Sequence, residues 1–247
     1  GLSGGARPNA EGLVLSLAKM NRIREIDALN CVARVEPGVR NLAISEAAQP
    51  YGLYYAPDPS SQIACSIGGN VAENSGGVHC LKYGLTVHNL LGLRMVDATG
   101  EVIEIGGKVY DSPGLDLLAL LCGSEGMLGV VTEVTVALLP KPASVAVMVA
   151  AFRNLDDAGN AVADIIGSGV IPAGMEMMDQ LAVQAAEQFA HAGYPMDAAA
   201  LLLIELDGAP AEVEELRSRV ERVVERHNAY HVEVAHDTES QVRLWKG

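Results

Sequence analysis

The sequence has 247 residues, of which 49% are hydrophobic and 19% charged, and its net charge is −14. A composition this apolar argues against disorder and can build a sizeable core, in one large or two medium domains. The strong negative charge, with no local basic patch, argues against binding to nucleic acid or to an anionic membrane surface. No apolar run reaches the roughly 18 to 20 residues that a membrane-spanning helix needs.

The first 140 residues predict short strands and helices in an irregular order. Apolar and β-branched runs bounded by turn formers predict strands, and spaced apolar residues predict helices. The expected strands are residues 13–17, 22–27, 31–35, 90–97, 101–105 and 129–139. The expected helices are residues 39–49, 67–74 and 115–121. This order fits an α+β domain better than a doubly wound one.

Three glycine-rich stretches lie in this part of the chain. Residues 57–77, PDPSSQIACSIGGNVAENSGG, hold four glycines, and residues 1–8 and 123–132 each join a glycine-rich turn to an apolar run. Glycine lets backbone N–H groups approach a ligand, and helix starts and turns offer such groups to phosphates. None of the three has a GxGxxG or GK[ST] motif, so together they predict a dinucleotide held by loops. A purely structural loop is the alternative for residues 57–77.

From residue 143 onward the pattern becomes regular. The expected strands are residues 145–152, 173–178, 198–206 and 230–234, and the expected helices are residues 156–167, 180–191 and 212–227. Two βαβ-like halves with an extra helix between them predict a ferredoxin-like open sandwich. The run Pro140-Lys141-Pro142 is the expected linker between the two parts.

The glycine-rich stretches, with Lys82-Tyr83-Gly84 between the second and the third, resemble the flavin-binding domain of the vanillyl-alcohol oxidase superfamily. Residues 76–94, GGVHCLKYGLTVHNLLGLR, and 174–182, GMEMMDQLA, are similar to FAD-linked 2-hydroxy-acid dehydrogenases of the glycolate oxidase branch. The resemblance implies an α+β fold with an FAD-binding PCMH-type (vanillyl-alcohol oxidase-like) domain at residues 1–140. A ferredoxin-like cap, the FAD-linked oxidase C-terminal domain, is expected at residues 141–247. The first domain is expected to lack its N-terminal part and the second its C-terminal part.

The resemblance also implies which residues bind FAD, without a covalent bond. The residues expected at the pyrophosphate are Gly1, Ser3, Gly4, Gly5, Pro57, Asp58, Ser60 and Ser61. Those expected along the flavin and ribityl chain are Ile67, Gly68, Gly69, Asn74, Gly76 and Gly77. Those expected at the adenosine end are Glu125, Gly129, Val130 and Val131. Glu125 is expected to accept hydrogen bonds from ribose hydroxyls, as acidic residues do in other dinucleotide sites; a solvated loop carboxylate is the alternative.

The histidines and cysteines predict no metal site. His79 is either an attachment point for FAD, a residue near the substrate, or a packed or solvent-facing loop histidine. The last interpretation is preferred because a lone histidine does not by itself indicate a function. His227 and His231 are four residues apart, but the helix is expected to end near Asn228, so they do not share a helix face. The four cysteines form no CxxC pair and are expected to be reduced thiols of an intracellular protein.

The implied activity is FAD-dependent oxidation of glycolate, or of a similar D-2-hydroxy acid such as D-lactate, to the 2-oxo acid, with hydride passing to flavin N5. The expected partners are the small hydroxy-acid substrate and companion subunits, one with flavin and one with iron–sulfur clusters. The expected location is the cytoplasm, or the periphery of the inner membrane through those subunits. The alternatives are a stand-alone D-lactate dehydrogenase and a non-catalytic flavin-binding electron-transfer subunit. Catalytic residues are expected beyond Gly247, so this chain alone is expected to be inactive.

Overall fold

The computed structural model describes residues 7–110, 114–235 and 237–247. The chain divides into two compact units, each discontinuous in sequence. Unit 1 consists of Gly1–Tyr55, Ser61–Ser75 and Leu90–Leu138, and unit 2 consists of Ala56–Ser60, Gly76–Asn89 and Leu139–Gly247. Two segments of the first half of the sequence therefore belong to unit 2. The domain boundary at residue 140 stays a prediction.

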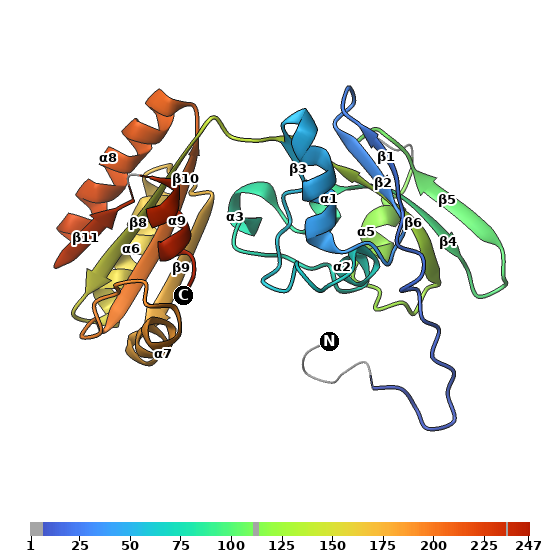
Figure 1. Cartoon of the computed structure of the whole chain (residues 1–247), viewed down its shortest axis with the longest axis horizontal. Helices are drawn as coiled ribbons and strands as arrows, with labels where there is room; N and C mark the ends of the chain where they lie inside the picture. The colour runs from blue at the N-terminus through green and yellow to red at the C-terminus, as the bar shows by residue number, and fades with distance from the viewer. Residues whose placement is uncertain (1–6, 111–113, 236) are drawn as a thin grey trace. The chain divides into compact units, whose positions relative to one another are not determined.

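Unit 1 is built on a five-stranded antiparallel sheet with the strand order β1-β2-β6-β4-β5 (Figure 1). Its strands are β1 (Ile23–Asp27), β2 (Val32–Val35), β4 (Leu90–Val96), β5 (Val102–Gly106) and β6 (Val130–Ala137). The strand richest in β-branched residues, β6, is the central one, and its Val134 and Val136 are completely buried. These residues suit a pleated, buried surface, which explains the central position of β6.

Two helices pack together beside this sheet. The helices of unit 1 are α1 (Asn41–Ala48), α2 (Ile67–Glu73) and α5 (Leu117–Leu121), and a short strand β3 covers Leu53–Tyr54. Ile44 of α1 and Ile67 of α2 are fully buried. Between these helices, Asn41 Nδ2 donates to Asn70 Oδ1 at 3.0 Å, and both side chains are buried. A buried amide pair of this kind fixes α2 against α1, because either partner left alone would be an unsatisfied polar group.

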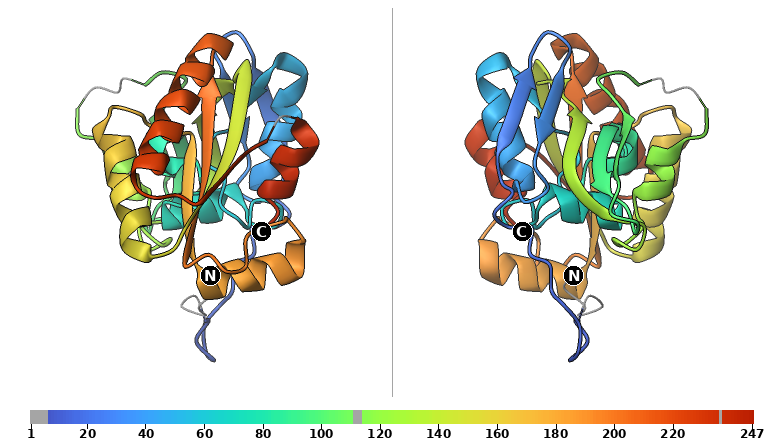
Figure 2. Two further views of the ribbon diagram at one scale, coloured as in Figure 1. Left: turned by 90° about the vertical axis from the view of Figure 1, so that its left-hand side faces the viewer. Right: turned by 90° about the vertical axis from the view of Figure 1, so that its right-hand side faces the viewer.

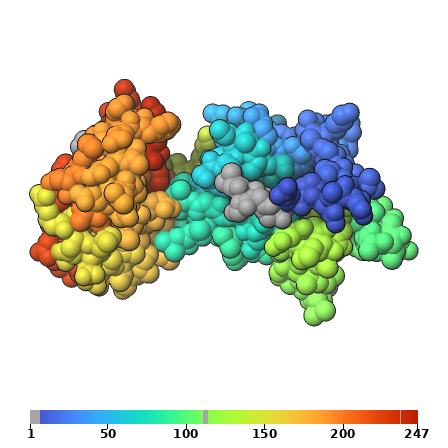
Figure 3. Space-filling view, turned by 90° about the horizontal axis from the view of Figure 1, so that it is seen from below, coloured from blue at the N-terminus to red at the C-terminus, as the bar shows by residue number. Residues whose placement is uncertain are grey.

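The strand expected at residues 13–17 is absent. This segment has no regular structure, and Leu13, Val14 and Leu15 are exposed, Leu13 completely. Figure 3 shows the chain from residue 7 to about residue 20, in dark blue, at the surface. An apolar run forms a strand only when a neighbouring strand is available to it, and no strand of the described residues pairs with this segment.

Unit 2 contains a four-stranded antiparallel sheet with the strand order β11-β8-β10-β9. Its strands are β8 (Ser144–Phe152), β9 (Gly174–Asp179), β10 (Ala200–Gly208) and β11 (His231–Val234), preceded by a short β7 (Leu139–Pro140). Its helices are α6 (Leu155–Gly167), α7 (Gln180–Ala190), α8 (Pro210–Arg226) and α9 (Thr238–Leu244). The first strand and the third lie next to each other, and α7 is inserted between the second and the third. The predicted ferredoxin-like order with one extra helix is confirmed.

Helices cover both faces of this sheet (Figure 2). On one face, Met148, Phe152 and Leu202 pack with residues of α6 and α8. On the other face, Val147 and Leu203 pack with residues of α7 and α9. Because successive side chains of a strand point to opposite faces, the apolar strands β8 and β10 supply both cores.

The segment Gly76–Asn89 of unit 2 forms two single-turn helices, α3 (Cys80–Tyr83) and α4 (Thr86–Asn89). Neither was predicted from the sequence, and neither was α9. The four-residue helices α3 and α4 are single turns, which are too short to show an apolar period. Among the residues that the structure describes, no helix has both the length and the hydrophobicity to span a bilayer.

Candidate functional site

The helix α2 begins at residues predicted to lie along the flavin. The N–H of Gly69 donates to the side chain of the N-cap residue, Ser66 Oγ, at 3.4 Å. The N–H groups of Ile67 and Gly68 donate to two carbonyl oxygens of the loop before α1, both at 2.8 Å. These three donors therefore already have acceptors within the protein. The general expectation that the N–H groups at a helix start bind a phosphate therefore gains no support at α2.

The C-terminal end of α2 contacts the loop predicted to bind adenosine. The N–H of Gly123 donates to the carbonyl of Val71 at 2.8 Å, and the N–H of Glu125 donates to the carbonyl of Ala72 at 2.9 Å. Asn74 ends the helix in the left-handed conformation, with a φ of 51°. Unit 1 thus brings together two glycine-rich stretches that are far apart in the sequence.

Cys122 contacts the side chain of Asn74 at this junction. The Sγ of Cys122 lies 3.5 Å from Asn74 Oδ1. Burial raises the pKa of the Cys122 thiol to about 11, so the thiol stays protonated and donates a weak hydrogen bond. This contact orients a side chain that was predicted to lie along the flavin.

The backbone of Glu125 is strained. Its φ is 54°, and the flanking Gly123 and Gly126 have φ values of 84° and 75°. A residue with a side chain adopts this conformation at a cost of about 1–2 kcal/mol. An exposed loop that keeps a glutamate in such a conformation is typical of a ligand-binding segment. The geometry leaves Glu125 available to ribose hydroxyls.

The glycines of residues 57–77 fall into two groups. A Cβ added to Gly69 would meet only Ser66 Oγ, at 3.4 Å, so this position is open to a ligand. The other three are closely packed against the protein: an added Cβ would lie 2.6 Å from Pro37 Cβ at Gly68, 2.5 Å from Leu85 Cδ2 at Gly76 and 2.3 Å from the Asp58 carbonyl oxygen at Gly77. Glycine is needed at these three positions because the chain approaches itself closely.

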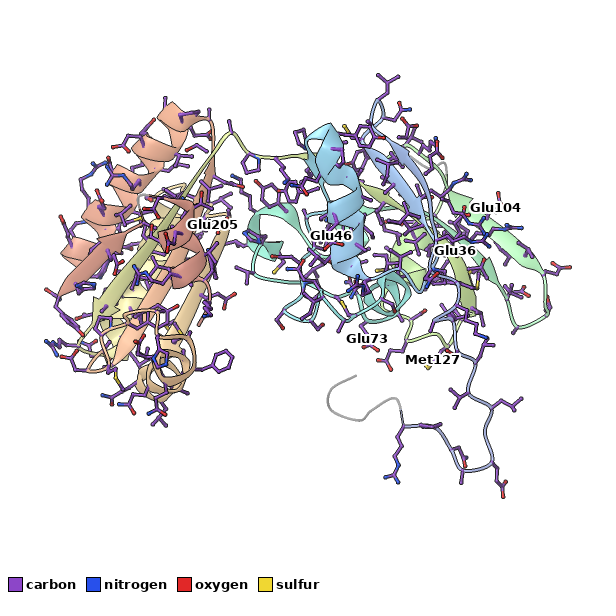
Figure 4. All side chains as sticks on the ribbon, in the orientation of Figure 1. Glu36, Glu46, Glu73, Glu104, Met127 and Glu205 are labelled. Carbon is purple, nitrogen blue, oxygen red and sulfur yellow. The ribbon has the colours of Figure 1, made fainter. Side chains whose placement is uncertain are left out.

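His79 lies between two carboxylates in unit 2. Its Nδ1 is 2.6 Å from Asp58 Oδ2, and its Nε2 is 3.1 Å from Glu205 Oε1 on β10. The other oxygen of Glu205 accepts the indole N–H of Trp245 at 2.6 Å. Figure 4 labels Glu205 on this strand. Both ring nitrogens of His79 are therefore engaged, so neither is free to be bonded to a flavin, and the preferred interpretation as a packed loop histidine agrees with the structure.

The charge of His79 follows from these contacts. Burial of the ring would lower its pKa, but the hydrogen bonds to Asp58 and Glu205 and their negative charges raise the pKa of His79 to about 10. The ring is an imidazolium at neutral pH and donates from both nitrogens.

A second ionic contact lies beside it. The Lys82 ammonium and the Tyr83 hydroxyl both donate to the carboxylate of Asp207, which is 3% exposed. Lys82 also donates to the backbone carbonyl of Asp207 at 3.0 Å. On β9, a Cβ at Gly174 would lie 2.6 Å from Val78 Cγ1, so this glycine makes room for the same segment. Residues 78–83 are thus fixed on the end of β9 and β10.

The structure distributes the predicted cofactor residues as follows. Gly1, Ser3, Gly4 and Gly5 lie outside the described residues. Unit 1 holds Ser61, Ile67, Gly68, Gly69, Asn74, Glu125, Gly129, Val130 and Val131. Unit 2 holds Pro57, Asp58, Ser60, Gly76 and Gly77. Asp58 was predicted at the pyrophosphate, yet its carboxylate contacts His79, which gives it a role within the protein.

Sequence reasoning missed Glu205, Asp207 and Trp245. A signal for the first two exists in the run LLLIELDG of β10, where two acidic residues alternate in an otherwise apolar strand. Residues two apart in a strand point to the same face, so the pair predicts a cationic partner there. Within the described part of the chain, no cluster of three or more histidine, cysteine, aspartate or glutamate residues could hold a metal ion.

Comparison with known proteins finds two family matches along the chain. The family described as "FAD binding domain" matches residues 1–106, and the family described as "FAD linked oxidases, C-terminal domain" matches residues 141–247. The chain belongs to the FAD-linked oxidases. FAD is the cofactor of this family, and the PCMH-type fold with an oxidase C-terminal domain is confirmed.

Two relatives and one solved structure illustrate the similarity. The "Glycolate oxidase subunit GlcD" of Escherichia coli (strain K12) is 58% identical over 247 residues, which is 100% of this chain and 50% of that protein. The "D-lactate dehydrogenase" of Archaeoglobus fulgidus is 41% identical over 189 residues, 76% of this chain and 42% of that protein. The structure of p-cresol methylhydroxylase with substrate bound matches 93% of this chain and 51% of the p-cresol methylhydroxylase chain, with a TM-score of 0.73. The two sequences are 20% identical, so this similarity shows the fold alone. The chain spans about half the length of the curated relatives it matches.

The described residues of this FAD-linked oxidase fit the cofactor in part. Gly69 leaves its side of α2 uncovered, and the exposed loop around Glu125 offers a carboxylate next to the end of the same helix. Backbone groups freed by glycine and one acidic side chain are the usual donor and acceptor set for a dinucleotide. The amides at the start of α2 are not part of that set.

Proposed function

We propose that this chain is the FAD-binding part of an enzyme that oxidises glycolate, or a closely related D-2-hydroxy acid, to the 2-oxo acid. The observation that carries the proposal is the 58% identity to a glycolate oxidase subunit along all 247 residues. At this level of identity both the cofactor loops and the C-terminal unit are shared, rather than a fold alone.

In this proposal residues of unit 1 hold the cofactor. When bound, FAD supplies the two-electron acceptor for the substrate Cα hydrogen. Gly69 and Asn74 at the two ends of α2 hold the isoalloxazine and ribityl portions, and Glu125 binds the ribose hydroxyls. Asn74 keeps its orientation through the protonated Cys122 thiol. The binding is non-covalent, which is supported by the engagement of both nitrogens of His79.

The test uses the full-length protein that contains this chain. Purified protein should be yellow, and acid or heat should release the colour into the supernatant as FAD. Glycolate should reduce a dye acceptor, and omission of glycolate is the control. Colour that stays with the denatured polypeptide would contradict non-covalent binding, and a lack of any flavin would contradict the assignment itself.

A second candidate is the oxidation of D-lactate by a stand-alone dehydrogenase, which is favoured by the similarity to a protein named D-lactate dehydrogenase. The two hydroxy acids differ by one methyl group, for which a pocket discriminates by about 10- to 200-fold. Comparing kcat/KM for glycolate and D-lactate on the same preparation decides between them. A ratio above ten in favour of D-lactate would reverse the order of the candidates.

The proposal includes companion subunits, one with flavin and one with iron–sulfur clusters, that accept the electrons. It is supported by the word "subunit" in the name of the most similar of the two relatives described above. We expect the protein to be cytoplasmic and to reach the inner membrane only through these partners. Affinity purification from native cells should yield an iron–sulfur protein in fixed proportion, and purification after salt washing of membranes tests the attachment. A bare flavoprotein with full activity towards the physiological acceptor would favour the stand-alone alternative.

A further inference from the structure

The strongest unexplained feature is the ionic anchoring of residues 76–89 on the C-terminal sheet. His79, Lys82 and Tyr83 all point at carboxylates of β10, which lie 126, 125 and 124 residues away in the sequence. The side chain of Glu205 is 14% exposed and that of Asp207 is 4% exposed. Apolar residues would cover the end of a sheet at least as stably, because ionised groups must lose their hydration. A buried charge is satisfied only where it meets its partner, so these contacts hold residues 76–89 in one defined position.

His79 is the centre of this arrangement, because it is bonded to two separate segments at once. Asp58 comes from the segment Ala56–Ser60, and Glu205 from β10. The backbone of His79 adds a third contact, since its N–H donates to Asp58 Oδ1 at 3.4 Å. Trp245, at the end of α9, lies beside the ring and holds the second oxygen of Glu205.

We propose that His79 is a positioning residue whose ring clamps the Asp58 loop and residues 76–89 onto β10, and so fixes the backbone of Gly76 and Gly77, which the resemblance to flavin-binding domains places along the flavin. The part of this inference that concerns the cofactor rests on the proposed function. The clamp itself concerns only described residues of unit 2.

Close packing transmits the position of the clamp to these glycines. An added Cβ at Gly77 would lie 2.3 Å from the Asp58 carbonyl oxygen, so the backbones of the two segments are in direct contact. Val78, the residue between Gly77 and His79, packs over Gly174 of β9. Release of Asp58 from His79 would free the segment on which Gly77 rests. A packed interface of this kind has few intermediate arrangements.

The clamp depends on pH in a direction that can be stated. Two charged groups contact the His79 ring: Asp58 from its loop and Glu205 from β10. The ion pair of Lys82 with Asp207 lies on the same segment and strand, and Trp245, which also contacts Glu205, is uncharged. The two carboxylates raise the pKa of His79 to about 10 against the burial of the ring. Deprotonation leaves the ring with one N–H for two carboxylates, so one arm of the clamp opens above that pH.

The first test measures the charge of His79 directly in the full chain. Nitrogen-15 NMR of the imidazole side chains should show His79 doubly protonated at pH 8, whereas an ordinary histidine is neutral there. The variant Glu205→Gln removes one of the two charges and should move the transition at least one pH unit lower. A neutral His79 at pH 8 would overturn the clamp.

The second test measures the loop and the cofactor. Hydrogen exchange of the amides of residues 76–89 should be at least tenfold faster in His79→Gln than in the wild type, and FAD should bind about tenfold more weakly, as expected for the loss of a charge-assisted hydrogen bond. His227→Gln is the matched control, because His227 Nε2 also contacts a carboxylate, Asp164 Oδ2, at 2.8 Å in the same unit. His79→Arg keeps a positive charge at all pH values and should restore FAD binding while removing its decline near pH 10.

The outcomes separate the clamp from the proposed function. A wild-type protein that binds no FAD would contradict the cofactor assignment, and with it the role of His79 towards the cofactor, while the imidazole spectrum and the exchange rates still decide whether the clamp exists. Equal exchange rates and equal FAD affinities in His79→Gln and His227→Gln would overturn the clamp even if FAD binds tightly.

Discussion

The two units hold their glycine-rich segments by different means. In unit 1, α2 and the loop at Glu125 are joined by backbone hydrogen bonds, such as Glu125 N–H to the Ala72 carbonyl. In unit 2, residues 76–89 are held by charged side chains that contact Glu205 and Asp207. Backbone bonds tolerate many side chains, whereas ionic anchoring requires a particular residue at each end. Substitutions in unit 2 should therefore disturb more than substitutions in unit 1, and the following predictions test that difference.

The largest effect is expected for Gly77→Ala. The added Cβ would meet the backbone of Asp58, which cannot move without breaking its contact with His79, so we expect a loss of about 3 kcal/mol in the free energy of unfolding. Gly69→Ala in unit 1 is the control, because its Cβ enters open space, and it should change the stability by less than about 1 kcal/mol. Urea unfolding measures both. Equal losses would show that the two segments are anchored alike.

The next effect is expected for Asp207→Ala. It leaves the Lys82 ammonium and the Tyr83 hydroxyl without their carboxylate at a site that is mostly buried. We expect a loss of about 2–3 kcal/mol, the usual range for hydrogen bonds to charged groups. The double variant Asp207→Ala with Lys82→Met should regain part of the loss, because it removes the unpaired charge. No recovery in a double-mutant cycle would mean that Asp207 acts through another contact.

The next prediction concerns pH. The folded pKa of His79, about 10, lies above its unfolded value of about 6.5. Its stabilisation is therefore complete below about pH 6.5 and declines as the pH rises towards 10. The difference in free energy of unfolding between the wild type and His79→Gln should be largest at pH 6 and close to zero at pH 10.5. Urea titrations at pH 6, 8 and 10.5 check this, and a difference that grows with pH would reverse the assignment of charge.

The smallest effect on stability is expected for Glu125→Gly in unit 1. Glycine adopts the φ of 54° without strain, so the stability should change by less than about 1 kcal/mol, in the favourable direction. FAD affinity should nevertheless fall several-fold if the carboxylate binds the ribose. Isothermal titration with FAD separates the two effects. A variant with unchanged FAD affinity would return Glu125 to the alternative of a solvated loop carboxylate.

The regular parts of the fold could be predicted from local sequence. The strands β8 and β10 are long apolar runs, and the helices α6 and α8 show the apolar spacing of an amphipathic helix, so their types and order follow from residues that are close in the chain. Residues 13–17 show the limit of this reasoning, because an apolar run that pairs with no neighbouring strand forms no strand itself.

The candidate site was predicted less completely, for a physical reason. The motif around α2 could be identified because glycine and serine mark close backbone approach locally. The contact between His79 and Glu205 could not be predicted, because the two residues are 126 positions apart and a single sequence carries no information on pairing across such a separation. The alternating acids of β10 indicate that a cation is needed, but they do not indicate which one.

The discontinuity of unit 2 has a consequence for recombination between relatives. A chimera joined at residue 140 would combine the β10 acids of one parent with the His79 and Lys82 of the other, although Ala56–Ser60 and Gly76–Asn89 pack with the C-terminal sheet. In such a hybrid each half keeps its own parental sequence, but the two residues of each ionic contact come from different parents. The two segments therefore depend on the C-terminal half for their ionic contacts. A chimera that keeps these contacts must exchange Ala56–Ser60, Gly76–Asn89 and Leu139–Gly247 together.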